Sequence, residues 1–238
     1  MNSNSGQCIL PYCDMERYEE RQQCILHIDD AAKDSGLFNR TLNRLIESKG
    51  FMFHGIYFPG DFTFPSTPDS RVRLLHCRFA GGFEVRKMVF PDQVSIEYTV
   101  FEGPVLFSEC HFETDVFFIN NQFHNLFSLY GSGFHGNTYL GFNTFRQGVN
   151  LYRIGFKADS RFLFRHCEMG CSFFHNADIQ HMEFVLCRWH KFYRLAEEQY
   201  HLKIPVKFGD LGVPDTYMNR LLLWVQRRLA FTNFPARL

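Results

Sequence analysis

Hydrophobic positions recur every eleven residues through the middle of the chain, in four parallel series. The first series, position 0 of the repeat, comprises Phe79, Phe90, Phe101, Phe112, Phe123, Phe134, Phe145 and Phe156, and continues with Cys167, Asp178 and Trp189. Position 6 comprises Val85, Ile96, Phe107, Phe118, Leu129, Leu140, Leu151, Phe162, Phe173 and Phe184. Position 4 comprises Phe83, Val94, Val105, Val116, Phe127, Thr138, Val149, Ser160, Cys171 and Met182. Position 9 is smaller: Cys77, Met88, Thr99, Cys110, Asn121, Ser132, Asn143, Ile154, Arg165, Asn176 and Cys187.

The spacing of these four series favours strands over a helix. An eleven-residue period is compatible with a right-handed coiled coil. However, the steps from position 4 to 6 and from 9 to the next 0 place two inward residues around one outward residue, which is strand alternation. Phe, Val and Ile at these positions also favour strands. Each repeat therefore predicts two very short strands, joined by corners of alternately two and three residues.

Units such as "FEGPVLFSECHF" (101–112) and "FRQGVNLYRIGF" (145–156) carry a recognisable pattern. They resemble the phenylalanine-rich variant of the pentapeptide-repeat proteins, over roughly residues 53–189. The resemblance implies an all-β solenoid: a right-handed quadrilateral β-helix with two repeats per coil and about six coils. Phe142, which does not follow the repeat, falls at a corner. Phe64 and Leu74 are one residue closer than a full repeat, which predicts an irregular corner at "PSTPDS".

The repeat also assigns the cysteines in this region. Cys77, Cys110 and Cys187 belong to position 9, Cys171 belongs to position 4, and Cys167 replaces a phenylalanine at position 0. All five are expected to point inward as small apolar fillers. The alternative is a disulfide ladder or a nucleophile, which no regular histidine or acid accompanies.

A separate group of soft ligands precedes the repeat. The spacing Cys8-x4-Cys13-x10-Cys24-x2-His27 suits a tetrahedral, structural Zn²⁺ site. The alternative is a set of reduced thiols beside a core histidine. "CILH" and "FPG" (58–60) also resemble the leader of uncharacterised bacterial pentapeptide-repeat proteins.

Three regions follow from these patterns: a zinc-binding and helical N-terminal cap (1–50), the β-helix (51–189) and a C-terminal helical cap (190–238). The stripe Leu37, Phe38, Leu42, Leu45 and Ile46 predicts a helix over 34–50, with Asp34 or Ser35 as N-cap, covering the first coil. Helices are also expected at 190–202 and 214–231. The apolar stripe of the second either packs on the last coil or forms a homodimer surface.

Composition, charge and the lack of targeting patterns predict the cellular compartment of the protein. The 238 residues include 29 Phe, are 45% hydrophobic and have zero formal net charge, so nothing attracts the whole chain to nucleic acid or a membrane. The start lacks the pattern of a secretory signal, and "LLLWV" is too short to span a bilayer. We therefore expect a cytoplasmic protein with reduced thiols.

The sequence contains no phosphate-binding loop, zincin or nucleophile-elbow motif, so we expect no enzymatic activity and no catalytic residues. No Lys or Arg occurs between Lys87 and Arg146, whereas the segment from Arg146 to Arg165 is basic. We expect a scaffold that binds another protein, as a regulator or defence component. The alternatives are a DNA-mimic inhibitor of an enzyme such as gyrase, and nucleic-acid binding through the zinc module and the basic section.

The candidate partner surface is outward-facing. In the predicted register, Phe117 and Tyr139 lie one coil apart on one face, in the row Ser95, Phe117, Tyr139, Arg161 and Glu183, with Leu106, Ser128 and Asn150 on the opposite face. The surrounding acids proposed for this surface are Glu97, Glu102, Glu113 and Asp115. The pair is either a binding site for a basic, apolar protein surface or a cross-strand contact that stabilises the sheet.

Overall fold

The computed structural model describes residues 6–170, 172, 177 and 179–188. The predicted C-terminal helices (190–202 and 214–231) and the assignments of Cys171, Phe173, Asn176, Asp178 and Trp189 lie outside these residues. No helix among the described residues is long and apolar enough to cross a membrane.

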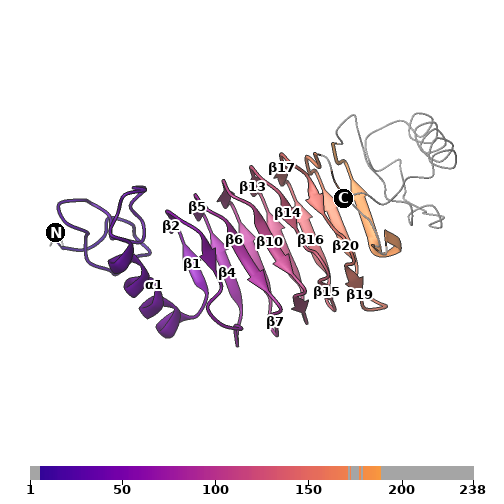
Figure 1. Ribbon diagram of the computed structural model, residues 1–238, viewed down its shortest axis with the longest axis horizontal. Coiled ribbons are helices and arrows are strands. Elements are labelled where there is room, and N and C mark those ends of the chain that lie inside the picture. Colours follow the sequence, from indigo (N-terminus) through magenta and orange to yellow (C-terminus); the bar gives the residue numbers. More distant parts are fainter. Residues whose placement is uncertain (1–5, 171, 173–176, 178, 189–238) are drawn as a thin grey trace.

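The chain forms a parallel β-solenoid of about six turns, with one helix at its N-terminal end (Figure 1). Four parallel sheets run along it, and we number them I to IV in the order in which the chain visits them. Sheet I contains β1 (Met52–His54), β4 (Val72–Leu75), β8 (Val94–Glu97), β12 (Val116–Ile119), β16 (Thr138–Gly141), β20 (Phe162–Arg165) and β21 (Met182–Val185). Sheet II contains β2 (Tyr57–Phe58), β5 (Arg78–Phe79), β9 (Val100–Phe101), β13 (Gln122–Phe123) and β17 (Thr144–Phe145). Sheet III contains β3 (Phe62–Thr63), β6 (Phe83–Arg86), β10 (Val105–Ser108), β14 (Phe127–Ser128) and β18 (Val149–Asn150). Sheet IV contains β7 (Val89–Phe90), β11 (His111–Phe112), β15 (Gly133–Phe134) and β19 (Gly155–Phe156).

The register matches two eleven-residue repeats per turn in the central coils. Val94 pairs with Val116, and Val116 pairs with Thr138, so each turn advances the chain by two repeats. Position 0 forms a column in which Phe79, Phe101, Phe123 and Phe145 stack at centroid distances of 4.9, 5.1 and 4.9 Å. A central turn has four sides, so equivalent positions on the same side lie one turn apart. Each phenylalanine therefore packs on the equivalent phenylalanine of the next turn.

A polar ladder lies inside this hydrophobic core at position 9. The Nδ2 of Asn121 donates to the carbonyl of Ile96 (2.8 Å), and the Nδ2 of Asn143 donates to that of Phe118 (2.7 Å). Their Oδ1 atoms accept the backbone N–H groups of Thr99 and Asn121 one turn back (2.9 and 3.0 Å). The amides thus pair backbone groups that the tight corner leaves without a strand partner. The repeat predicted inward positions here but not this network.

The two-residue corners require left-handed backbone. His76, Lys87, Tyr98, Glu109, Asn120, Phe142 and Arg153 all have φ between 51° and 57°, and they occupy equivalent corners. Phe142 is among them and is 51% exposed, which confirms that the phenylalanine outside the repeat sits at a corner. A left-handed non-glycine residue costs about 1 kcal/mol, so the stacked core offsets this strain at every turn.

The predicted register is wrong for part of the last described turns. Phe162 pairs with Thr138 and therefore occupies position 4 instead of 6, while Phe164 pairs with Leu140 and takes position 6. Ser160 is buried but precedes this strand, where it closes a turn by donating to the carbonyl of Lys157 (2.7 Å). The corner between β19 and β20 therefore contains two residues more than the repeat allows.

Three further assignments change with this insertion. Cys167 directly precedes the bridge between Glu168 and Thr144, so it lies at position 9, below Asn143, and Met169 fills position 0. Arg165 pairs with Gly141 and is exposed, not inward. Leu163, not Arg161, follows Tyr139 in the outward row. The next turn, from Phe162 to Met182, is shorter than two repeats by the same amount, so Met182, Phe184 and Cys187 return to the predicted register.

Helix α1 (Ser35–Lys49) covers the first coil, as predicted. The Asp34 side chain accepts the N–H of Leu37 (2.9 Å) as the N-cap, and Phe38, Leu42 and Leu45 are buried. The ring of Phe38 meets that of Phe58 edge to face at 5.7 Å. The turn from Phe53 to its strand partner Leu74 is one residue shorter than two repeats, which confirms the irregular corner before β4.

Candidate metal centre and outer face

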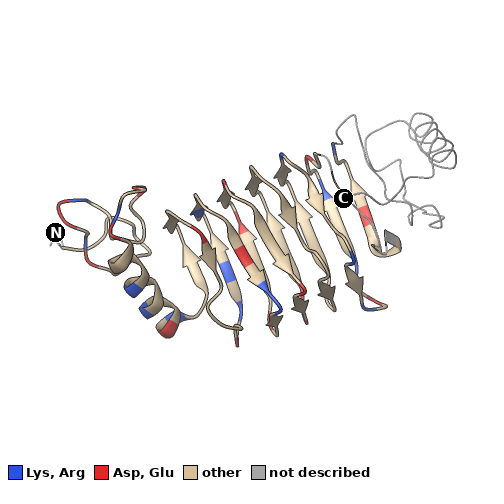
Figure 2. Cartoon of the chain, in the orientation of Figure 1, with Lys and Arg blue, Asp and Glu red and all other residues tan. Residues whose placement is uncertain are grey.

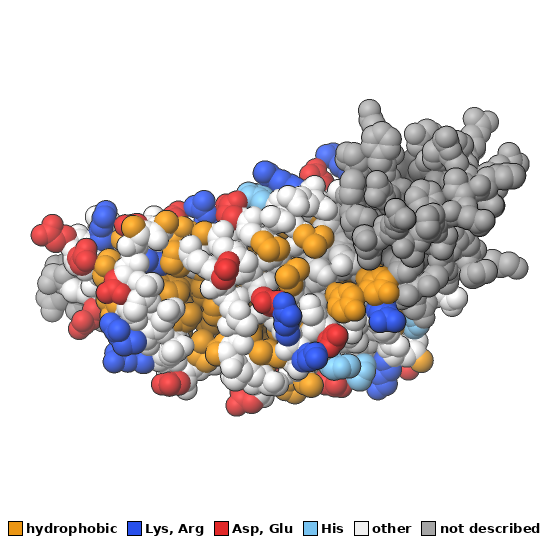
Figure 3. Space-filling model, viewed as in Figure 1, with side chains coloured by type: hydrophobic (Ala, Val, Ile, Leu, Met, Phe, Trp, Pro, Cys, Tyr) orange, Lys and Arg blue, Asp and Glu red, His pale blue; other side chains and the backbone are white. Residues whose placement is uncertain are grey.

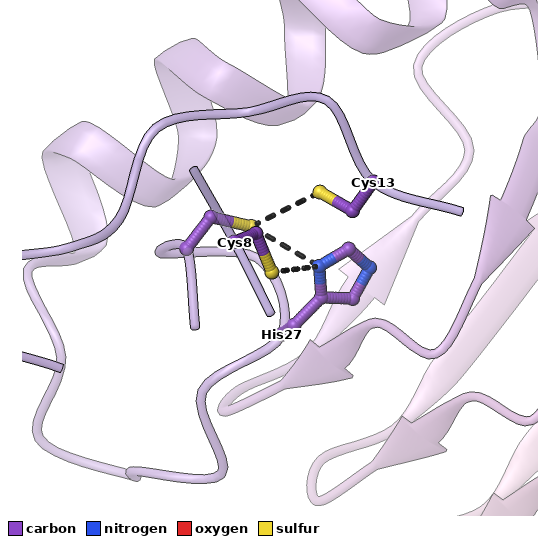
Figure 4. A group of neighbouring side chains, drawn as sticks. Cys8, Cys13 and His27 are labelled. Atoms are coloured by element: carbon purple, nitrogen blue, oxygen red, sulfur yellow. Dashed lines mark hydrogen bonds between the residues drawn. The ribbon is translucent and has the colours of Figure 1, made fainter. Parts of the chain in front are cut away.

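The four predicted ligands converge in the N-terminal cap. The side-chain donor atoms of Cys8, Cys13, Cys24 and His27 all lie within 4.8 Å of one another. Figure 4 shows Cys8, Cys13 and His27 pointing toward a common centre. Backbone hydrogen bonds hold the segments that carry them: Cys8 N–H donates to Met15 O (2.8 Å), and His27 N–H donates to Cys24 O (3.1 Å). Two short segments, one with Cys8 and Cys13 and the other with Cys24 and His27, thereby present two candidate ligands each.

The spacing between ligand atoms fits a tetrahedral metal ion. The Sγ atoms of Cys13 and Cys24 are 3.7 Å apart, and the Nδ1 of His27 lies 3.7 Å from Cys8 Sγ and 3.1 Å from Cys24 Sγ. In a tetrahedral site with metal–sulfur bonds of about 2.3 Å, ligand atoms are separated by roughly 3.5–3.8 Å. The cluster can therefore hold a metal ion with little rearrangement.

A second hydrogen bond fixes the orientation of the imidazole. The Nε2 of His27 donates to the carbonyl of His54 in β1 (2.8 Å), so Nδ1 keeps its lone pair for a metal. Tyr12 stacks on the ring of His54 at 3.5 Å and meets His27 edge to face at 5.7 Å. A Cβ at Gly55 would lie 2.4 Å from the Tyr12 hydroxyl, and φ there is +68°, so this position requires glycine.

The electrostatics of the cluster also favour a cation. Burial, together with the neighbouring thiols, raises the pKa of Cys13 to about 12, and burial raises the pKa of Cys24. Burial lowers the pKa of His27, so its imidazole is held in the neutral form that ligates metals. Three adjacent thiols cannot all ionise unaided, whereas a divalent cation compensates their negative charge.

Lys33 is a buried residue next to the candidate site that the sequence did not reveal. It is 5% exposed, and its Nζ donates to the carbonyls of Leu26, Ile28 and Tyr57 at 3.3, 3.3 and 2.6 Å. Burial lowers its pKa to about 8. Leu26 and Ile28 flank the candidate ligand His27, and Tyr57 belongs to β2, so Lys33 connects the loop that carries His27 to the first turn. A single lysine in a charged segment, "DDAAKD", has no pattern that marks it as buried.

The cysteines of the solenoid have a different environment. Cys77, Cys110, Cys167 and Cys187 are buried, and each has a free thiol. Burial raises the pKa of Cys77 to about 12. Among the described residues these thiols act as core fillers, which confirms the inward orientation predicted for these four, although Cys167 lies at position 9.

Phe117 and Tyr139 are neighbours on the outer side of sheet I. Their backbones pair directly, and both side chains are partly exposed. The ring of Tyr139 lies over Gly141, where an added Cβ would be 2.5 Å from it. Figure 3 shows hydrophobic side chains, in orange, among charged ones on the face in view. From β4 to β21 the outward row is Arg73, Ser95, Phe117, Tyr139, Leu163 and Glu183, and a second row is Leu75, Glu97, Ile119, Gly141, Arg165 and Val185. Met52 and His54 of β1 precede Arg73 and Leu75 in these rows. On sheet III, Leu106, Ser128 and Asn150 stack as predicted.

The four proposed acids lie on two sides of the rod. Glu97 is on the outer side of sheet I, where its Oε1 accepts from Ser95 Oγ (2.6 Å). Glu113 and Asp115 lie at the corner between sheets IV and I, and Glu102 lies at the corner between sheets II and III. Figure 2 shows acidic and basic residues interspersed along the solenoid.

Three of these acids have specific partners. Glu102 bonds to His124 Nδ1 and to Arg78 (3.4 Å), and these interactions, led by the His124 hydrogen bond, lower its pKa. Glu113 bonds to His135 Nδ1 (2.7 Å). The carboxylate of Asp115 accepts the N–H of Asn137 (2.8 Å). These carboxylates therefore serve contacts between adjacent turns.

Comparison of the chain with models of protein families, with curated proteins and with solved structures finds no significant match.

Proposed function

We propose that this protein is a non-enzymatic scaffold that binds a protein partner on the outer side of sheet I. The observation that carries this proposal is the band of partly exposed apolar side chains Phe117, Ile119, Tyr139 and Leu163 on three adjacent strands. A regular sheet holds these side chains in fixed positions, so binding them requires little ordering. Aromatic side chains on a rigid surface are frequent sources of binding energy.

The metal that we propose for the N-terminal cap is Zn²⁺. Three thiolates and one imidazole form the donor set of structural zinc sites, and the ion would crosslink segments that have little core of their own. Because four protein ligands complete a tetrahedron, no coordination position is left for a substrate. This closed donor set supports a structural, non-catalytic role.

We further propose that the solenoid is a right-handed quadrilateral β-helix of the pentapeptide-repeat class. The support is the two-repeat step of the central coils and the visit to four sheets in each of the four turns from β4 to β19. Reduced, buried thiols are consistent with the cytoplasmic location expected from the sequence.

The DNA-mimic hypothesis has less support. A mimic of DNA needs rows of carboxylates that face the partner enzyme. Glu102 and Glu113 instead pair with His124 and His135, and Glu97 accepts from Ser95. We therefore favour the protein-binding scaffold.

Site-specific photocrosslinking tests this proposal. Benzoylphenylalanine replaces Phe117 in one variant and Leu106 in another, since Leu106 is the equivalent partly exposed position on sheet III. We expect irradiation in cells to give a discrete crosslinked product from position 117 and none from position 106, with the crosslinked chain identified by mass spectrometry. Equal labelling at both positions would refute the proposal. A crosslink from position 117 only to other residues of its own chain, with no second chain attached, would also refute it.

A further inference from the structure

On the outer side of sheet I, acidic and basic residues occupy mirrored positions along the sheet. Over the six strands from β4 to β21, the first row begins with Arg73 and ends with Glu183, and β1 continues the two rows beyond β4 with Met52 and His54. In the second row, Glu97 on β8 and Arg165 on β20 lie equally far from the middle of these six strands. The apolar residues Phe117, Ile119 and Tyr139 are on β12 and β16, at the centre between them. Each basic residue thus has an acidic counterpart at the mirrored position of the same row.

We propose that this face binds a second copy of the chain, with the two rods antiparallel. The proposal rests on the proposed function, because it names the partner of the same surface. The two-fold axis lies in the interface, parallel to the strands and between β12 and β16. Rotation about such an axis keeps each row opposite itself and reverses the order of strands. Strand β4 then faces β21 of the second copy, β8 faces β20, and β12 faces β16.

This arrangement pairs every charged residue of the two rows. Arg73 faces Glu183 of the second copy, and Glu97 faces Arg165 of the second copy, and each pair occurs twice. Within the described part of one chain, Arg73 and Glu97 approach each other at 4.0 Å, whereas neither Arg165 nor Glu183 has an ion-pair partner and both are exposed. The second copy therefore supplies partners to the two charges that lack one.

The apolar residues meet at the centre of the same arrangement. Phe117 faces Tyr139 of the second copy across the axis, which buries both rings. Ile119 faces Gly141 of the second copy, a position that the ring of Tyr139 covers. The charges are left at the periphery, as in stable interfaces.

A parallel arrangement of the two rods lacks these pairs. An axis along the rod would place each strand opposite itself and the first row opposite the second. Arg73 would then face Leu75, Leu163 would face Arg165, and Glu183 would face Val185. Three of the four charges would meet aliphatic side chains, at a cost in desolvation without compensation, and only Glu97 would meet a polar residue, Ser95. Charge order therefore selects the antiparallel dimer.

The size of the face predicts a weak dimer. Six strands spaced about 4.8 Å apart, with two outward rows, define a patch of roughly 30 by 15 Å, or about 900 Å² buried over both copies. Interfaces below about 1,200 Å² are typical of transient complexes. We expect a monomer–dimer equilibrium in the micromolar range, and a dissociation constant that increases with salt concentration because the peripheral pairs are solvent-accessible.

A charge-reversal cycle on the full chain tests this inference by sedimentation velocity. Glu97→Arg and Arg165→Glu should each raise the dimer dissociation constant at least about tenfold, because each creates two like-charge contacts. The double variant Glu97→Arg, Arg165→Glu should restore dimerisation. Within one chain these residues are separated by two intervening strands, roughly 14 Å, so the rescue must arise between copies. Lys157→Glu, an exposed corner residue with the same charge change as Arg165→Glu, should have no effect.

A second pair of variants addresses the apolar centre. Phe117→Ser should abolish dimerisation, while Leu106→Ser, its equivalent on sheet III, should not. A dimer that all single charge reversals leave intact, or a double variant without rescue, overturns the antiparallel arrangement. A chain that is monomeric at every concentration, but whose position 117 crosslinks to a different protein, overturns the dimer and supports the scaffold function. A monomer whose position 117 crosslinks only to its own residues 189–238 overturns both.

Discussion

The N-terminal cap and the solenoid achieve order in opposite ways. Residues 6–33 contain a single β-bridge, Gln7 with Glu16, and they contact the first turn through the clustered Cys and His side chains, Lys33, and buried apolar residues such as Ile25 and Leu26. The central turns of the solenoid repeat the same contacts, and the stacked phenylalanines there are nearly equivalent. We therefore expect a few groups to determine the stability of the cap, whereas the solenoid distributes its stability over nearest-neighbour contacts.

This difference teaches how each region should respond to change. If the proposed metal crosslinks the cap, loss of one ligand should affect the whole cap, whereas loss of one core residue should remove only the contacts of its own turn and the two beside it.

The largest effect is expected from Cys24→Ser. Purified protein should contain about one zinc per chain, and this variant should contain none, because structural zinc sites contribute on the order of 10 kcal/mol and lose most of it with one ligand. Elemental analysis measures the zinc. Hydrogen exchange should show loss of protection in residues 8–33 while strands β8 to β16 stay protected.

Cys110→Ser is the matched control, since Cys110 is a buried thiol of the solenoid outside the cluster. It should keep the zinc. Equal zinc content in Cys24→Ser and the wild type would disprove the metal assignment. Cooperative unfolding of the rod on chelation would show that cap and solenoid do not behave as separate units.

Phe123→Ala should be the most destabilising of these substitutions within the solenoid. Phe123 is fully buried and stacks on Phe101 and Phe145, so truncation should cost about 3–5 kcal/mol. Phe142→Ala, at an exposed corner, should cost less than about 1 kcal/mol. Denaturant titration of both variants gives the comparison, and similar losses would contradict the inward assignment of position 0.

Lys33→Met should loosen the junction between the two regions. The variant removes three hydrogen bonds from buried carbonyls and should cost about 2 kcal/mol, while methionine keeps the contact with Phe38. The folded-state pKa of about 8 lies below the ordinary 10.5, so the unfolded chain binds more protons between these values. The contribution of Lys33 to stability therefore rises as pH increases from 8 to 10.5.

Thermal unfolding of the wild type and of Lys33→Met across this pH window measures that contribution. The difference in stability between the two proteins should widen with increasing pH. A difference that narrows would show that the three carbonyls hold the ammonium form more strongly than burial disfavours it.

Thr138→Val is expected to have the smallest effect, and to be stabilising. The Oγ1 of Thr138 is buried and accepts or donates no hydrogen bond among the described residues, while valine occupies the equivalent site in β8 and β12. Replacing the hydroxyl with a methyl group should therefore add about 1 kcal/mol. The same substitution at Thr99, whose Oγ1 donates to Glu97 O (3.0 Å), should destabilise, and a loss of stability at both sites would argue against an unpaired hydroxyl at Thr138.

The eleven-residue period determined much of this structure by itself. It placed Phe79, Phe101 and Phe123 in the core and Phe142 at a corner, because a side chain in a solenoid mainly contacts its equivalents one turn away. The ligand set Cys8, Cys13, Cys24 and His27 was also legible, since metal sites restrict both residue type and spacing.

Only the tertiary structure decided the rest. Two extra residues before β20 are balanced by two fewer before β21, and a period counted along the chain cannot reveal where such a pair of changes falls. Lys33 is buried because carbonyls from three separate positions converge on it, and His27 is oriented by a carbonyl of β1. Because of that shifted register, Leu163 and not Arg161 occupies the outward row. The mirrored order of charges on sheet I depends on the same shift. Repetition encodes contacts between equivalent residues, whereas contacts between non-equivalent segments depend on how the folded chain brings them together.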